Sequence, residues 1–344
     1  MLGAVGVLLA KTGVLDPHGR KTLSKLIYFV FTPCLTFAKL APVLTARTFV
    51  LWMPLAINMF FSVAVGLLLG VLLVLLVRPP AGFSKHVIVT TGLGNAGNLP
   101  LVLVAALMRS SGSTLFAGQD VSVDLAIAYV AVGIFAATVT HFTIGTQLLK
   151  APGSKAAGQH AGGAAASAAA GNLTSPPLVG CMLAVGVGML PLLRHQLFSP
   201  GGHLLLVQDC IAMFGDCCIP SLMLMLGATL AKGPGRCCPP LRVVLGVTAA
   251  RLLLLPLLGT GWLLLASKAG WLLAPDSVFL LVMLIQNSVP TALNVHTLAT
   301  LNSNREEEVG ALLFWQYLAS CITTPAWLMF YTWLLKSGAF AVAA

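Results

Sequence analysis

Long apolar runs, separated by short polar stretches, occupy most of this 344-residue sequence. A helix needs about 20 mostly apolar residues to cross a bilayer. The pattern therefore predicts an all-α membrane protein of ten transmembrane helices. We place them at roughly residues 1–15, 22–44, 49–77, 85–108, 122–147, 177–193, 204–231, 241–267, 276–300 and 307–335. The first run is short, and we expect it to be a truncated helix.

The chain divides into two halves around a stretch rich in Ala, Gly and Ser. Residues 151–175 have the composition of a flexible linker. Five predicted helices lie on each side, which predicts a first five-helix repeat in residues 1–150 and a second in residues 176–344. Because five is an odd number, duplicated halves must have opposite orientations, as in many secondary transporters.

Prolines in matching helices support this inverted repeat. Pro33 in the second run corresponds to Pro220 in the seventh, and Pro100 in the fourth corresponds to Pro290 in the ninth. The offsets are 187 residues (220 minus 33) and 190 residues (290 minus 100), so both pairs keep nearly the same spacing.

Composition excludes an ordinary soluble protein. Charged residues make up 8% of the chain, whereas soluble domains carry about 25%. The net charge of +10 does not indicate nucleic-acid binding, because the basic residues are not clustered with aromatic ones. They concentrate instead in the loops on one side, which places the linker in the cytosol and both termini outside or in a lumen. The basic residues of that side are Lys11, Arg20, Lys21, Lys25, Arg78, Lys85, Lys150, Lys155, Lys232, Arg236, Arg242 and Arg305.

The fourth predicted helix contains an unusual polar interruption, from Gly94 to Pro100. Glycine has low helix propensity, and proline removes a backbone donor, so we expect the helix to break here. A break within a bilayer must be buried in protein or line a wet cavity. Asn95 and Asn98 lie in the break, where their side chains can bond the freed backbone groups or a ligand.

The ninth predicted helix repeats this device. Gln286, Asn287 and Ser288 precede Pro290. The two helices run in opposite directions, so their breaks are expected to cross, with two half-helix N-termini facing one site. Such termini favour a carboxylate. The alternative interpretation of each motif is a proline kink whose backbone groups are satisfied locally.

We single out three of the ionisable residues inside predicted helices, namely Lys39, Asp216 and Arg251. Ionisable groups are costly within a bilayer and usually pair or mark a transport path. We expect either a structural ion pair, of Asp216 with Lys39 or Arg251, or a role in coupling. The sequence contains no HExxH, GxSxG or Walker A motif, so we expect no enzyme activity, no cofactor and no metal site.

The segment GNAGNLPLVLVAAL resembles the signature of the PIN-LIKES proteins in the auxin efflux carrier family. The similarity extends through KLIYFVFTPCLTFAKLA, FGDCCIPSLMLMLGATL, ARLLLLPLLG, QNSVPTALNVHTLATLN and EEEVGALLFWQYLAS, which occur in family order.

This resemblance implies two inverted five-helix repeats in which helices 4 and 9 cross at their prolines, as in bile-acid/sodium symporters. It also implies transport of auxin, an indole carboxylate, in the endoplasmic reticulum membrane, with the plasma membrane as the second choice. By motif match, the substrate site would comprise Asn95, Asn98, Pro100, Asn287 and Pro290.

We therefore expect a secondary transporter of small organic anions that works by alternating access in a lipid bilayer. Indole-3-acetate or a related monocarboxylate is the expected substrate, and a second copy of the chain is a candidate partner. The alternatives are a sodium-coupled symporter of bile-acid type, a non-transporting receptor or scaffold, and an intramembrane hydrolase. A symporter would show ion cages beside the crossing, whereas a hydrolase would need a nucleophile with a base partner.

Overall fold

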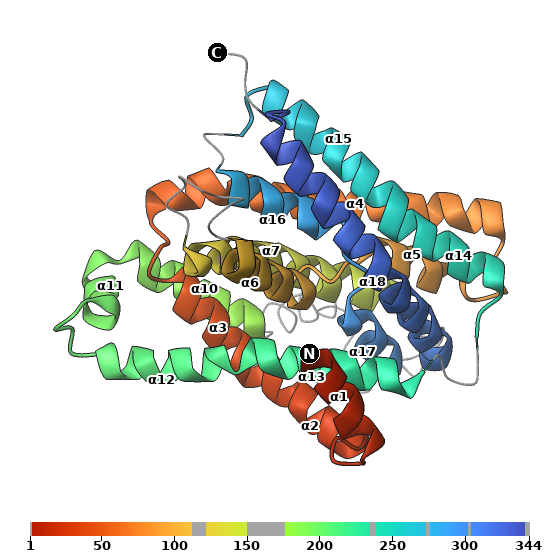
Figure 1. Cartoon of the computed structure of the whole chain (residues 1–344), viewed down its shortest axis with the longest axis horizontal. Coiled ribbons are helices and arrows are strands. Elements are labelled where there is room, and N and C mark those ends of the chain that lie inside the picture. The colour runs from red at the N-terminus through yellow and green to blue at the C-terminus, as the bar shows by residue number, and fades with distance from the viewer. Residues whose placement is uncertain are drawn as a thin grey trace, which may run out of the picture. The chain divides into compact units, whose positions relative to one another are not determined.

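A computed structural model describes residues 2–111, 122–149, 176–233, 238–272, 276–301 and 304–340. The predicted linker lies outside these residues. The described part is helical apart from turns, connecting loops and one isolated antiparallel bridge, between Gly94 and Thr291. Figure 1 shows the helices along the chain.

The described helices of the first half of the chain extend to residue 149. Their bounds are α1 Leu2–Lys11, α2 Pro17–Leu26, η1 Ile27–Phe31, α3 Thr32–Leu40, α4 Ala46–Val77, α5 Ser84–Gly92, α6 Asn98–Ser111, α7 Val123–Thr140, η2 His141–Gly145 and α8 Thr146–Leu149, where η denotes a π-helix.

The described helices of the second half start from residue 176. Their bounds are α10 Pro176–Met189, α11 Pro191–Phe198, α12 Leu205–Asp216, α13 Cys218–Lys232, α14 Leu241–Ala249, η3 Ala250–Leu254, α15 Leu255–Lys268, α16 Ser277–Asn287, α17 Leu293–Leu301 and α18 Glu306–Lys336.

Five stretches of the described helices are long and apolar enough to cross a membrane. They are His18–Leu40, Arg47–Val77, Leu205–Met225, Leu241–Lys268 and Glu306–Lys336. A sixth is obtained if the bent pair Leu178–Met189 and Pro191–Phe198, which meet at 106°, counts as one span.

Other predicted spans are interrupted or shorter. The run at 85–108 consists of α5 and α6, and the run at 276–300 consists of α16 and α17. Both are divided at their Asn- and Pro-containing segments, because proline and glycine disfavour a continuous helix there. At the N-terminus, α1 has ten residues.

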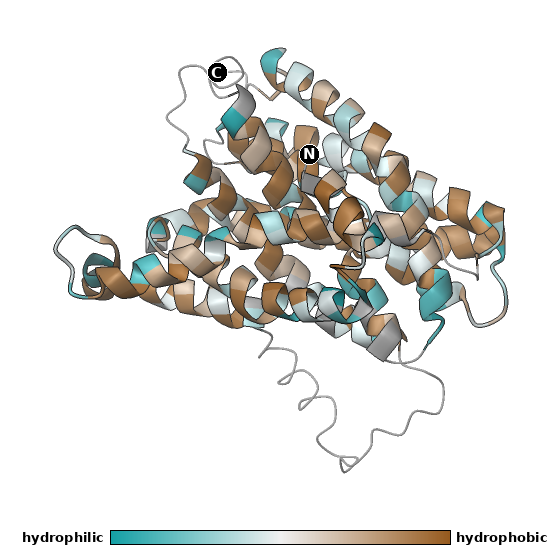
Figure 2. Cartoon of the chain, turned by 60° about the horizontal axis from the view of Figure 1, so that its bottom comes forward, coloured by the Kyte–Doolittle hydropathy of each residue, from teal (hydrophilic) through white to brown (hydrophobic). Residues whose placement is uncertain are grey.

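Apolar side chains cover much of the outer surface. Leu76, Ile322, Met329 and Met213 are each more than two-thirds exposed, and Figure 2 shows hydrophobic residues along most of the helices. A soluble monomer rarely exposes large contiguous apolar patches. This surface suits a hydrocarbon solvent, so the chain is an integral membrane protein.

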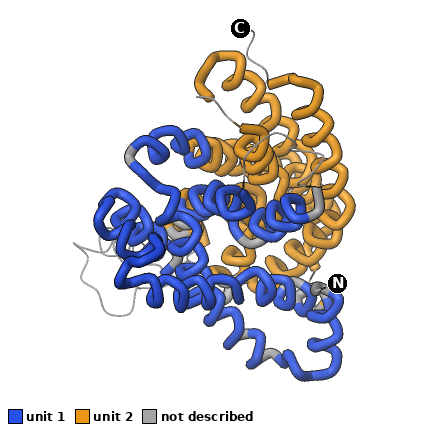
Figure 3. Tube along the Cα trace, turned by 60° about the vertical axis from the view of Figure 1, so that its left-hand side comes forward, with its two compact units in different colours: residues 1–56, 97–135, 175–232 blue, residues 57–96, 136–174, 233–344 orange. Residues whose placement is uncertain are grey.

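The chain forms two compact units, shown in Figure 3. Unit 1 comprises Met1–Ala56, Gly97–Phe135 and Ser175–Lys232, whereas unit 2 comprises Ile57–Ala96, Ala136–Thr174 and Gly233–Ala344. Each unit therefore combines segments from both halves of the sequence.

Small residues allow close helix packing in both units. In unit 1, α1 packs on α13, and a Cβ atom at Gly6 would overlap the backbone of Leu224. In unit 2, Gly66 and Gly70 of α4 face α5, where a Cβ at Gly70 would lie 2.7 Å from Ile88 Cα. This spacing of small residues is typical of helix contacts in membranes.

Unit 2 also contains a pair of long helices. The segment α14, η3 and α15 runs beside α18 (Figure 1). Trp327 Nε1 of α18 donates a hydrogen bond to the Leu252 carbonyl of η3 at 2.8 Å. This contact holds the π-helix η3 against α18.

We predict that Gly70→Ala destabilises the protein by about 1–3 kcal/mol, because the added methyl group meets backbone atoms of α5. Gly261→Ala is the matched control, since nothing lies within 4 Å of a Cβ at this helical glycine. The control should be neutral or stabilising by up to about 1 kcal/mol. Thermal melting of both purified variants measures the difference, and equal melting temperatures would contradict close packing of α4 on α5.

Candidate functional site

Two helix breaks meet within unit 2. The first follows Gly92, the last residue of α5, and the second follows Asn287, the last residue of α16. The Asn95 backbone N–H donates to the Pro290 carbonyl at 2.8 Å, and the Ala292 N–H donates to the Leu93 carbonyl at 2.9 Å. The breaks predicted from the sequence thus contact each other through a short antiparallel bridge. We call the place where the segments that follow α5 and α16 meet the crossing.

Side chains of α18 satisfy further polar groups at this crossing. Asn95 Nδ2 donates to Tyr317 Oη at 2.6 Å, and Tyr317 Oη donates to the Thr291 carbonyl at 3.1 Å. Gln316 Oε1 accepts from the Thr291 N–H at 3.0 Å and from Thr291 Oγ1 at 2.8 Å. One turn of α18 therefore fixes both breaks.

Asn287 is anchored on the other side by α4. Its Nδ2 donates to Asn58 Oδ1 at 3.1 Å and to the Met283 carbonyl at 3.0 Å. Asn58 Nδ2 in turn donates to the same Met283 carbonyl at 3.0 Å. Both asparagines are fully buried, so they connect α4 to the end of α16.

A cation lies at the same crossing. Arg251 in η3 is fully buried. Its Nε donates to the Val289 carbonyl at 2.9 Å, and its Nη1 donates to the carbonyls of Thr91 and Gly92 at 3.2 and 3.3 Å. Gly94 makes room for it, because a Cβ there would overlap Arg251 Nη2.

Several buried polar atoms around the crossing have no hydrogen-bond partner among the described residues. They are Arg251 Nη2, Gln286 Nε2, Gln316 Nε2 and Asn287 Oδ1. Buried polar groups are normally paired with protein or ordered water. Three of these four atoms are donors, so an acceptor atom of water or of a ligand would be needed to pair them.

Residues 1–328 match the family described as "Membrane transport protein". The chain belongs to this family. The transporter is 25% identical to Protein PIN-LIKES 2 of Arabidopsis thaliana over 96% of its own length and 91% of that protein. It is 26% identical to Protein PIN-LIKES 6 of the same plant over 95% and 89% of the two chains.

A fungal relative matches less of the transporter. An uncharacterized transporter of Schizosaccharomyces pombe is 27% identical over 42% of this chain and 34% of that protein. These matches confirm the resemblance to PIN-LIKES proteins and the class of membrane transport protein.

The remaining predicted substrate residues belong to unit 1 of the transporter. Asn98 is the first residue of α6, and Pro100 is buried in its first turn. Proline is compatible with this turn, because the N–H groups there have no partner within the helix. The Asn98 side chain lies outside the described part of the structure.

Unit 1 also holds a charged cluster. Lys39 Nζ of α3 lies 2.9 Å from Asp124 Oδ1 of α7 and 3.8 Å from Asp216 Oδ1 of α12. The Lys39 side chain is 19% exposed, whereas both aspartates are more than two-thirds exposed. Of the two partners considered for Asp216, Lys39 lies at ion-pair distance, and Arg251 instead binds backbone carbonyls in unit 2.

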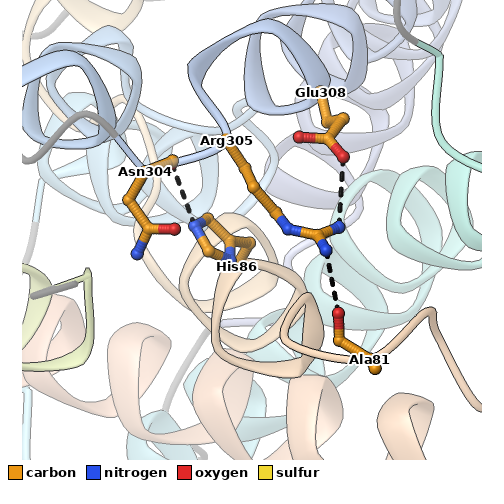
Figure 4. Close-up of polar contacts among 5 residues, drawn as sticks. All are labelled: Ala81, His86, Asn304, Arg305 and Glu308. Atoms are coloured by element: carbon orange, nitrogen blue, oxygen red, sulfur yellow. Dashed lines mark hydrogen bonds and ion pairs between the residues drawn. The ribbon is translucent and has the colours of Figure 1, made fainter. Parts of the chain in front are cut away.

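A second polar cluster joins two loops of unit 2 (Figure 4). Arg305 donates to the Ala81 carbonyl at 2.8 Å and to Glu308 Oε1 at 3.1 Å. His86 Nε2 donates to the Asn304 carbonyl at 3.1 Å. These bonds connect the segment before α18 to the segment before α5, so the starts of these helices are held together.

Several polar residues that build the crossing were not among the site residues predicted from the sequence. Asn58, Thr291, Gln316 and Tyr317 all lie within predicted spans. Their polarity inside apolar runs could have identified them, since polar residues at membrane depth usually have a partner or a function. Asp124 of unit 1 was also not predicted as a site residue. It lies in the first turn of its helix, near the start of the predicted span.

We predict that Tyr317→Phe destabilises the transporter by about 1–3 kcal/mol, because the Asn95 amide and the Thr291 carbonyl both lose a buried partner. Ser320→Ala is the control, since its hydroxyl donates only within α18, to the Tyr317 carbonyl. Its loss should cost less than about 1 kcal/mol. Thermal melting compares the two variants, and a Ser320 variant as unstable as the Tyr317 variant would contradict the bridging role.

Proposed function

We propose that this transporter is a secondary carrier of small organic anions that works by alternating access. The observation that carries the proposal is the direct contact of the two helix breaks, with buried polar atoms that lack partners in the described residues. Broken helices at membrane depth occur where they are buried in protein or line a wet cavity. Such breaks build substrate sites in many secondary transporters.

The charge at the crossing supports an anionic substrate. None of the ion pairs within the described residues involves Arg251, so its positive charge meets backbone carbonyls and no carboxylate. Gln286 and Gln316 add unpartnered amide donors. A carboxylate accepts bonds from such donors, and charge-assisted hydrogen bonds are stronger than neutral ones.

The substrate residues that we propose are Asn95, Asn98, Pro100, Asn287 and Pro290. In the conformation described, the Nδ2 groups of Asn95 and Asn287 bond other side chains. Substrate binding would therefore require these amides to exchange a protein acceptor for the substrate carboxylate. Lys39, Asp124 and Asp216 are the candidates for a coupling group, since Lys39 lies near two carboxylates.

We propose the substrate class from the resemblance to the family. The PIN-LIKES relatives match nearly the whole chain, and the resemblance implies an auxin-like monocarboxylate such as indole-3-acetate. On the same basis we propose ten helices in two inverted five-helix repeats and residence in the endoplasmic reticulum membrane.

Uptake into proteoliposomes that contain the purified full chain tests this function. We expect saturable uptake of labelled indole-3-acetate, with competition by other small monocarboxylates and none by the uncharged amide, indole-3-acetamide. Empty liposomes provide the background. The proposal would be contradicted if indole-3-acetate entered only at the rate of empty liposomes and no other monocarboxylate tested was taken up.

We predict that Asn98→Ala weakens substrate affinity about tenfold or more, because a hydrogen bond to a charged group contributes roughly 1.5–3 kcal/mol. The melting temperature should change little. Asn304→Ala is the matched control, since its Nδ2 binds the Leu149 carbonyl and its loss should lower stability with affinity unchanged. Unchanged affinity and reduced stability in the Asn98 variant would leave Asn98 a structural role only.

A further inference from the structure

Arg251 connects the C-terminal ends of two half-helices. Thr91 and Gly92 are the last residues of α5, and Val289 lies two residues beyond the end of α16. The guanidinium donates to the carbonyls of all three, over distances of 2.9 to 3.3 Å. A single side chain thus bonds the last two carbonyls of α5 and a carbonyl in the break that follows α16.

A cation suits this position for a general reason. The last carbonyls of a helix have no partner within the helix, and they carry the negative end of its dipole. Water cannot satisfy them in a dry membrane interior. Sets of backbone carbonyls replace the hydration shell of monovalent cations in ion-selective proteins. The three carbonyls around Arg251 are therefore a potential cation site that the guanidinium fills.

The surroundings indicate that the site is built for this side chain. Arg251 is fully buried and lies in a π-helical segment, a feature frequent at functional sites. Gly94 leaves space for Nη2, which any larger residue would fill. Burying a charge is costly unless it is well bonded, so a purely packing role would be served better by an apolar residue.

We propose that Arg251 is a positioning residue that acts as a tethered cation. It holds the ends of α5 and α16 together, so that the crossing needs no free cation in its carbonyl site. The proposal depends on the geometry of the crossing and not on the identity of the substrate. Failure of organic-anion uptake would therefore leave it intact, and its own test measures stability.

Thermal melting of the purified full chain tests this role. Arg251→Met keeps much of the apolar volume but removes all donors, and it should lower the melting temperature by roughly 5–10 °C. Arg251→Lys keeps the charge, so its melting temperature should fall by less than that of Arg251→Met. Arg242→Met is the matched control, because Arg242 lies in α14 and binds the Arg78 carbonyl from an exposed position. It should melt like the wild type.

Cation rescue separates positioning from packing. In Arg251→Ala, millimolar methylguanidinium should raise the melting temperature by several degrees, because a ligand that binds only the folded state stabilises it. Sodium chloride, compared with choline chloride at equal ionic strength, tests whether a metal cation also fits. Neither addition should stabilise the wild type or the Arg242 variant in this way.

A double-mutant cycle with Gly94 covers the case in which the alanine variant does not fold. Gly94→Ala should destabilise the wild type, because its methyl group displaces the guanidinium, and should cost clearly less in the Arg251→Met background. An Arg251→Met protein that melts like the Arg242 control would overturn the proposal. Additive effects of the two substitutions, or a lysine variant less stable than the methionine variant, would overturn it as well.

Discussion

The crossing depends on one constraint, which is that backbone groups within a bilayer need partners from the protein. Each helix break frees N–H and carbonyl groups that lipid cannot satisfy, at a cost of several kcal/mol for each group. The two breaks satisfy part of this need mutually, through the bonds of Asn95 to Pro290 and of Ala292 to Leu93. Tyr317, Gln316 and Arg251 satisfy much of the rest.

This solution makes stability and proposed function depend on the same atoms. The Asn95 amide that would bind a carboxylate already bonds Tyr317, and the Asn287 amide already bonds Asn58. A substrate that takes over these donors would leave acceptors of α18 and α4 to be satisfied by water or by a rearranged side chain. Binding would thus favour a different local arrangement, because a ligand shifts a conformational equilibrium toward the state that it binds more tightly.

The sequence predicted the breaks better than it predicted their partners. Gly94 and Pro290 oppose a continuous helix through local backbone chemistry, so short sequence segments were sufficient to locate them. The bond from Asn95 to Tyr317 joins residues 222 positions apart, and no local pattern encodes such a pair. Hydropathy likewise did not locate the 106° bend, because the predicted span 177–193 runs from α10 past the bend into the start of α11 and both sides of the bend are apolar.

The buried guanidinium also bears on how the transporter would select its substrate. A fixed positive charge in surroundings of low dielectric acts on any nearby charge more strongly than it would in water. The helix-end carbonyls offset part of this charge, but Arg251 Nη2 has no acceptor among the described residues. Under the proposed function, this charge would favour an anionic substrate over its neutral analogue.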